Sequence, residues 1–190
     1  MNKNELRNKY KILRESLDEE TIISNSLSIA NQLLKLNVWE YTYYHLFLSI
    51  VAKKEIDTET VLQILFAKNK EVVVSKSDFK TDTLSHFLLT DNTQLKINNY
   101  GIPEPINGLP VPESMIEVVF VPLLAFDVYG NRVGYGKGFY DDFLSKCKPC
   151  TIKIGLSFYE AEDKIEGVYP GDISLDYCIT PSKIYKFNEE

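Results

Sequence analysis

A glycine-rich segment between an apolar run and a helical pattern is the feature that most restricts how this chain can fold. Residues 127–144 read DVYGNRVGYGKGFYDDFL, and four glycines alternate there with Arg132 and Lys137. The preceding run VVFVPLLAF predicts a buried strand, and Tyr140, Phe143 and Leu144 recur at helical spacing. This order is typical of phosphate sites in α/β proteins. Glycine lets backbone amides approach an anion, and the helix N-terminus adds partial positive charge.

The glycine spacing differs from the two common glycine loops. The pattern G-x-G-x-G lacks the last glycine of the dinucleotide fingerprint, and Lys137 precedes Gly138 rather than the Ser or Thr of a Walker loop. A lone G-x-G is more often a surface loop. Here the loop lies between a predicted strand and a predicted helix, and it carries two cations and a carboxylate. These features together favour a phosphate site. Asp141 is placed where it could hold a metal ion against that phosphate.

Strand patterns that alternate with helical patterns predict an α/β fold, specifically a three-layer α/β/α arrangement with a mostly parallel sheet. The expected helices are residues 3–17, one capped by Asp18, one beginning at Thr58 and one after the glycines. The expected strands are residues 43–51, 71–75, 84–89, 118–124, 151–157 and 177–180, with 84–89 near an edge. The prolines of residues 100–112 indicate a loop.

Several candidate residues follow expected strands, and ligands of such sheets lie beyond the C-terminal ends of the strands. We therefore expect four segments to converge on one cleft: Glu55, the loop 101–105, the glycine loop and the Gly171-Asp172 turn.

Composition narrows the class of protein. The chain has 190 residues, 44% of them hydrophobic and 25% charged, which predicts a single globular domain over 1–190. Its net charge of -6 argues against a general nucleic-acid binder. No apolar run is long enough to cross a bilayer, and the N-terminus lacks the apolar core of a secretory signal. We expect a cytoplasmic monomer that acts on small molecules, without nucleic-acid or membrane partners.

The cysteines and histidines carry no chemistry that the sequence can identify. Cys147 and Cys150 form a C-x-x-C pair, but a second pair for zinc is absent and the pair closes a helix rather than opening one. His45 and His86 have no visible partners, so we interpret both as structural and find no nucleophilic triad.

Segments along almost the whole chain together resemble the 5-formyltetrahydrofolate cyclo-ligase (methenyltetrahydrofolate synthetase) family. They are K-x-x-x-R at Lys3 and Arg7 followed by Arg14, EIDT at 55–58, GIPEP at 101–105, VPLLAFD at 121–127 continuing through the glycines to Tyr140-Asp141, and Asp172 with Leu175-Asp176 and Thr180. Phe139 departs from the family's frequent Tyr, and Gly171 from its bulkier residue.

This resemblance implies an ATP- and Mg²⁺-dependent ligase that converts 5-formyltetrahydrofolate to 5,10-methenyltetrahydrofolate through a phosphorylated formyl group. It implies catalytic roles for Arg132 and Lys137, and metal carboxylates at Asp141 and Asp172. The implied ATP-binding residues are Lys3, Arg7, Arg132, Val133, Gly134, Tyr135, Gly136, Lys137, Gly138, Phe139 and Tyr140. The implied folate-binding residues are Glu55, Tyr135, Gly136, Lys137, Gly138 and Phe139.

Plainer interpretations stay open at this point. Lys3 and Arg7 suit a solvated helix face, Glu55 suits the cap region of the next helix, and Asp141 and Asp172 suit surface carboxylates near a helix start. Two other functions also fit the fold: a nucleotide-responsive regulatory protein, and a sugar-phosphate isomerase that uses a phosphate loop without ATP or Mg²⁺.

Overall fold

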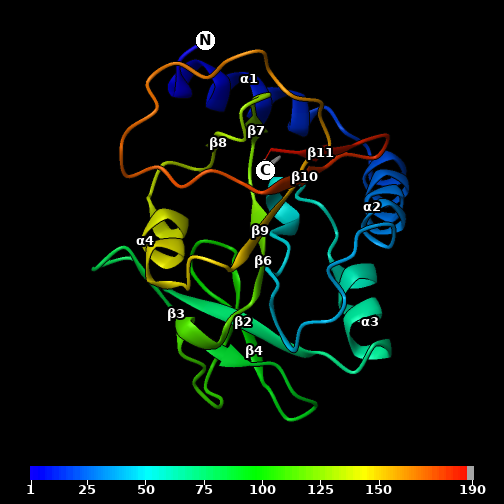
Figure 1. The fold of residues 1–190 in the computed structure, drawn as a ribbon, viewed down its shortest axis with the longest axis vertical. Coiled ribbons are helices and arrows are strands. Elements are labelled where there is room, and N and C mark those ends of the chain that lie inside the picture. Colours follow the sequence, from blue (N-terminus) through cyan, green and yellow to red (C-terminus); the bar gives the residue numbers. More distant parts are fainter. Residues whose placement is uncertain (188–190) are drawn as a thin grey trace.

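A seven-stranded, mostly parallel sheet forms the centre of the computed structural model, which describes residues 1–187 (Figure 1). The strand order is β11-β10-β9-β6-β1-β2-β3. The strands are β1 (Tyr43–His45), β2 (Glu71–Asp78), β3 (Thr83–Leu88), β6 (Val118–Pro122), β9 (Ile152–Leu156), β10 (Tyr177–Ile179) and β11 (Ile184–Lys186). The five central strands pair in parallel, and β3 and β11 pair antiparallel at the two edges. The predicted mostly parallel sheet is confirmed, as is the edge position of residues 84–89.

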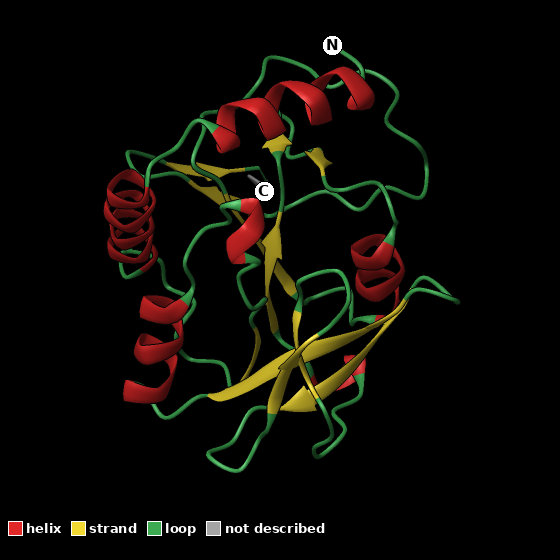
Figure 2. Ribbon diagram, turned by 180° about the vertical axis from the view of Figure 1, so that it is seen from behind, coloured by secondary structure: helices red, strands yellow, loops and turns green. Residues whose placement is uncertain are grey.

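Helices cover both faces of the sheet, which confirms the three-layer prediction. Helices α2 (Glu19–Leu33) and α3 (Glu59–Ala67) lie on one side, and α4 (Phe139–Lys146) lies on the other (Figure 2). Ile29, Leu33 and Leu65 pack into the core under the first pair. Phe143 and Leu144 pack into the core under α4. Asp18 caps α2 as predicted, since its carboxylate accepts the Thr21 amide.

The first helix, α1 (Lys3–Glu15), crosses beyond the C-terminal ends of the strands (Figure 1). It contacts a two-stranded ribbon formed by β7 (Ala125–Phe126) and β8 (Arg132–Val133). Leu6 and Tyr10 are buried there against Leu124 and Ile165. This apolar stripe fixes α1 above the sheet edge, where ligands of parallel sheets bind, and Lys3 and Arg7 lie beside the stripe on the same side of the helix.

Two predicted segments differ from the structure, and one strand of the main sheet was not predicted. The strand predicted over 43–51 is only β1, because the apolar chain leaves the sheet after Leu46 and turns into the 3-10 helix η1 (Val51–Lys53). The loop predicted over 100–112 contains β5 (Pro103–Pro105), which pairs with β4 (Leu95–Ile97) outside the main sheet. The prolines thus exclude a central strand but not a short ribbon. Strand β11 was not predicted. Within residues 1–187, no helix combines the length and apolar character needed to span a membrane.

Candidate active site

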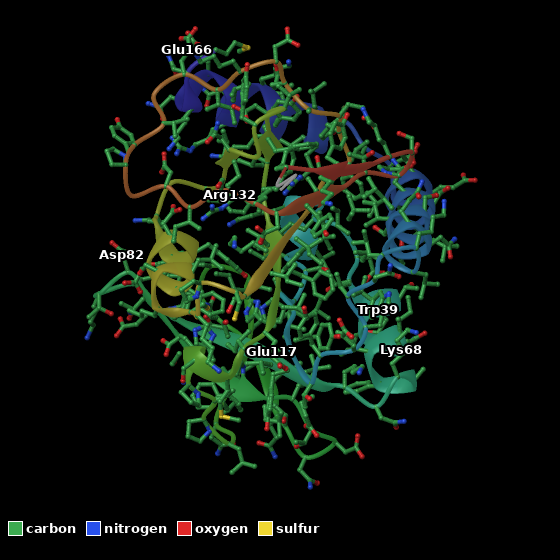
Figure 3. The ribbon with its side chains drawn as sticks, viewed as in Figure 1. Trp39, Lys68, Asp82, Glu117, Arg132 and Glu166 are labelled. Atoms are coloured by element: carbon green, nitrogen blue, oxygen red, sulfur yellow. The ribbon has the colours of Figure 1, made fainter. Side chains whose placement is uncertain are left out.

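A cavity of about 1150 Å³ lies at the C-terminal edge of the sheet, between α1, the glycine loop and the loops that follow β1 and β4. Figure 3 shows Arg132 in the region between α1 and α4, with Glu166 above it beside α1. The expected convergence of separate loops on one cleft is confirmed. The predicted site residues on its wall are Lys3, Arg7, Glu55, Arg132, Gly134, Tyr135, Gly136, Lys137, Gly138, Phe139, Tyr140, Asp141 and Asp172.

A tight turn between β7 and β8 fixes the position of the glycine loop that follows it. Asp127 is fully buried, and its carboxylate accepts the backbone amides of Tyr129, Asn131 and Ile165. Gly130 has φ +83°, and a Cβ there would lie 2.8 Å from a ring carbon of Phe187. Neither residue lines the cavity, so Gly130, unlike the three later glycines, is not on the wall of the predicted phosphate site. Together they fix the hairpin that projects Arg132 and the following glycines.

Val133 is the one predicted site residue that does not face the cavity. Its side chain is fully buried among Leu6, Tyr10 and Leu124, and its carbonyl accepts the Leu124 amide. Alternation along β8 explains this position, because Arg132 and Val133 must point to opposite faces of the ribbon. Val133 therefore anchors the loop, while its neighbour reaches the cavity.

Four cations form one end of the cavity. Arg7 lies against the glycine loop: its Nε donates to the Gly134 carbonyl at 3.0 Å, and a Cβ on Gly136 would meet its guanidinium at 3.2 Å. Lys3 pairs with Asp172, and Arg132 donates to Asp141 at 2.7 Å. Lys137 is exposed, and no carboxylate among the described residues pairs with it. Although the chain has a net negative charge, positive charge is concentrated at this end of the cavity, where it can bind an anionic ligand.

The two predicted metal carboxylates, Asp141 and Asp172, belong to this charge network. Asp141 also accepts the Ile173 amide at 3.0 Å, and Asp172 accepts the Tyr169 amide at 2.6 Å. Partial burial acts to raise the pKa of Asp172, but the Lys3 ion pair and the Tyr169 amide hold it below its ordinary value. No cluster of three or more His, Cys, Asp or Glu able to hold a metal occurs in residues 1–187. The metal role of this pair stays a prediction.

A buried acid, Glu55, also lines the cavity beside the glycine loop. Glu55 accepts the Tyr135 hydroxyl at 2.6 Å and the Ile50 amide at 2.8 Å, so it does not cap the next helix. Arg14 donates to the same hydroxyl at 2.8 Å, and sequence reasoning gave Arg14 no role in the site. Burial, and then the Glu55 charge, raise the pKa of Tyr135. The phenol therefore stays protonated and orients the Glu55 carboxylate.

A neutral wall completes the cavity, and sequence reasoning missed it. His45 and Ser75 line it from neighbouring strands. Phe79 and Tyr100 stack with ring centroids 3.9 Å apart, and Phe79 meets Phe139 edge-on at 5.2 Å. Of these rings, only Phe139 could be recognised from the sequence as a site residue, because it adjoins the glycine loop. Phe79 and Tyr100 come from separate loops.

The cysteines lie apart from this cavity. Burial raises the pKa of Cys147 to about 11, so its thiol is not activated at neutral pH. Cys150 is exposed and Cys178 is buried.

A glycine loop, a cation cluster and a buried acid on one cavity at the sheet edge define an α/β enzyme site for an anionic small molecule. The family model described as "5-formyltetrahydrofolate cyclo-ligase family" matches residues 1–161. The chain belongs to this family. It is an enzyme, a ligase of folate metabolism whose family activity is the cyclisation of 5-formyltetrahydrofolate to 5,10-methenyltetrahydrofolate.

Curated relatives match over most of their length. A probable 5-formyltetrahydrofolate cyclo-ligase of Schizosaccharomyces pombe is 28% identical, and the match covers 98% of each chain. The 5-formyltetrahydrofolate cyclo-ligase of Haemophilus influenzae is 31% identical over 77% of this chain and 76% of its own. Among solved structures, a 5,10-methenyltetrahydrofolate synthetase of Aquifex aeolicus superposes with a TM-score of 0.78 and 26% identity, covering 100% of this chain and 95% of that one.

Proposed function

We propose that this enzyme uses ATP and Mg²⁺ to close the ring of 5-formyltetrahydrofolate, releasing ADP and phosphate through a phosphorylated formyl intermediate. The observation that carries the proposal is the single cavity. It joins a cation-rich glycine loop to a buried acid, so two substrates of different chemistry fit side by side. A cavity of about 1150 Å³ is also large enough to hold both a nucleotide and a folate ring.

The glycine loop and α1 form the ATP side of the site. Phosphoryl transfer needs positioning and neutralisation of charge more than covalent help from the protein. Lys3, Arg7, Arg132 and Lys137 supply that charge, and Arg132 and Lys137 act on the transferred group. Gly138 caps α4 without a side chain, which leaves the first amides of α4 to an anion in the cavity.

Asp141 and Asp172 fit a metal that arrives with ATP better than a metal held by the protein alone. Mg²⁺ commonly takes one or two carboxylates and completes its shell with phosphate oxygens and water. Each carboxylate here is oriented by a backbone amide, as oxygen ligands usually are. When bound, Mg²⁺ would be held by Asp141 and Asp172 and would lower the charge on the transferred group.

The folate ring belongs beside Glu55, Tyr135 and Phe139. Glu55 is a buried acceptor with a fixed orientation, which suits an N–H of the substrate near the closing nitrogen. The ring of Phe139 offers a flat apolar face next to the glycine loop. Gly136, Lys137 and Gly138 lie between this side and the ATP side, so they contact both substrates.

The chemistry balances in two steps. The formyl oxygen attacks the γ-phosphorus, a C–O–P bond forms, and the bond from the γ-phosphorus to the leaving ADP oxygen breaks. N10 of the folate then attacks the formyl carbon, and the C–O bond breaks as phosphate departs with its electron pair. The N10 proton ends on the released phosphate. Phosphorylation is needed because the formamide oxygen alone is a poor leaving group.

We further propose that the enzyme is active as a monomer, as predicted from the sequence. Size-exclusion chromatography of the active enzyme checks this, and an active species of twice the chain mass contradicts it. The cytoplasmic location and the single domain over 1–190 stay predictions from sequence.

The function is tested by the absorbance of 5,10-methenyltetrahydrofolate. Purified enzyme with 5-formyltetrahydrofolate should form it only with ATP and Mg²⁺ together, with one phosphate released per ring closed. Omitting ATP, chelating the metal or supplying a non-hydrolysable ATP analogue should each stop it. Ring closure at an equal rate without ATP refutes the proposal.

A further inference from the structure

Three polar side chains form a hydrogen-bonded chain along the neutral wall of the cavity. His45 Nε2 lies 2.7 Å from Ser75 Oγ, and Ser75 Oγ lies 2.9 Å from His86 Nδ1. The three residues come from the adjacent strands β1, β2 and β3, and Ser75 and His86 are direct partners in the β2–β3 register. His45 and Ser75 face the cavity, while His86 lies behind them.

This polar chain is enclosed by aromatic rings. The Phe143 ring centroid is 5.0 Å from that of His45 and 4.0 Å from that of His86. Burial holds the pKa of His45 well below its ordinary value and lowers the pKa of His86 to about 4. Both imidazoles are therefore neutral at pH 7, and each has one donor and one acceptor nitrogen.

Glu113 sets the direction of the hydrogen bonds. Its carboxylate, which only accepts, lies 3.9 Å from His86 Nε2. A hydrogen on His86 Nε2 leaves Nδ1 as the acceptor for the Ser75 hydroxyl. Whichever imidazole donates, Ser75 Oγ donates to one of the two and accepts from the other. One lone pair of Ser75 remains, on the side that faces the cavity.

We propose that Ser75 accepts a hydrogen bond from a ring N–H of the reduced folate, and that His45 and His86 position the hydroxyl for this contact. The inference rests on the proposed function. The ring is the fitting ligand because this wall is neutral, is flanked by the Phe79 and Phe139 rings, and offers an acceptor that would repel a phosphate. A reduced pterin carries several ring N–H donors.

Replacement of the hydroxyl tests the contact. Ser75→Ala should raise the KM for 5-formyltetrahydrofolate about tenfold, the loss expected for one buried hydrogen bond, and leave the KM for ATP within about twofold. Ser85→Ala is the matched control. Ser85 lies on β3 with its hydroxyl on the exposed side, bonded to the Lys76 carbonyl, and its loss should change neither KM.

Ser75→Cys separates recognition from packing. A thiol of similar size fills the same space but accepts hydrogen bonds poorly, so this variant should keep the wild-type Tm and show the raised folate KM. It also serves if Ser75→Ala fails to fold. A folate KM unchanged in Ser75→Cys, or a raised KM for ATP instead, overturns the inference. Wild-type enzyme without ATP-dependent ring closure would instead overturn the proposed function itself.

Glu113→Gln tests the direction of the His45–Ser75–His86 hydrogen bonds, because Glu113 itself does not line the cavity. An amide both donates and accepts, so the variant no longer fixes the hydrogen on His86 Nε2. The folate KM should rise by less than in Ser75→Ala, with unchanged Tm. A folate KM equal to that of wild type overturns the role assigned to Glu113.

Discussion

The cavity has two walls that are built in opposite ways. The loop wall comes from one continuous segment, Gly134 to Asp141, together with α1, and it is charged and partly exposed. The sheet wall is the neutral wall described above: His45 of β1 and Ser75 of β2 face the cavity, and His86 of β3 is bonded to Ser75 from behind. The difference matches the two substrates that we propose, since phosphates need cations and a folate ring needs flat faces and a few oriented hydrogen bonds.

The two walls also differ in what specifies them. Backbone conformation specifies the loop wall, where Gly136 has φ +94° and Gly138 has φ +76°. Strand register specifies the sheet wall, where Ser75 lies opposite His86. Substitutions in the loop wall should therefore affect ATP strongly, and changes in the sheet wall should affect the folate and stability.

The largest effect is expected at Gly136. Gly136→Val should abolish ATP binding in a folded protein, because a branched side chain is strained at φ +94° and its Cβ would meet the Arg7 guanidinium at 3.2 Å. Titration calorimetry with ATP measures the loss. Gly171→Ala is the control, since no atom lies within 4 Å of a Cβ there. Unchanged ATP affinity in Gly136→Val would remove the glycine loop from the ATP site.

The next effect concerns the metal carboxylates. Asp141→Asn should lower turnover about 100-fold and raise the Mg²⁺ concentration needed for half activity, with little change in folate binding. Asn keeps an acceptor for the Ile173 amide, so the fold should persist. Asp172→Asn should act in the same direction.

Asp142→Asn is the matched control for this series, because Asp142 pairs with Lys146 on the exposed side of α4. Normal turnover and normal Mg²⁺ dependence in Asp141→Asn would contradict the metal role. The function of Asp141 would then be limited to its ion pair with Arg132.

A smaller effect is expected at Arg7. Arg7→Ala should raise the KM for ATP about tenfold or more, because a hydrogen bond to a charged group contributes about 1.5–3 kcal/mol. Adenosine binding should change less than ATP binding. Lys9→Ala is the control, since Lys9 pairs with Glu162 away from the cavity. If removal of residues 1–8 leaves the kinetics intact, α1 is not part of the site.

Local sequence patterns predicted most of the fold. Helical periodicity located α1 and α2, and the Asp18 cap was visible in the sequence. The strand over 43–51 was overextended because an apolar run indicates burial and does not show where pairing ends. Strand β11, at the edge of the sheet, was not predicted.

The same distinction explains which half of the site was predicted. The loop wall is contiguous, so its glycines, cations and Asp141 were found together. His45, Ser75 and His86 meet only through strand register, across separations of 30 and 11 residues. The sequence showed no partners for His45 and His86, and the structure gives both a hydrogen bond to Ser75. The structural role of Asp127 was not predicted, because three of its hydrogen bonds come from backbone amides that no side-chain pattern indicates.

The smallest predicted effect is the pH dependence of stability, which reports on the sheet wall. Burial lowers the pKa of His86 from 6.5 to about 4, and His45 shifts in the same direction, so the unfolded chain binds more protons between these values. Stability is then complete above about pH 6.5 and falls as the pH decreases toward 4. At pH 5.5 each histidine should contribute a loss of about 1 kcal/mol relative to pH 7.5.

Urea unfolding at pH 7.5, 6.5 and 5.5 measures this slope. His45 and His86 are the only histidines of the chain, and carboxylates with lowered pKa, such as Glu162 and Asp172, act at more acidic pH. His86→Asn should therefore reduce the slope in this window, leaving the part that His45 contributes. A free energy of unfolding that stays constant from pH 7.5 to 5.5 would show that protons reach both imidazoles in the folded state. The sheet wall would then not be the closed, neutral surface that distinguishes it from the loop wall.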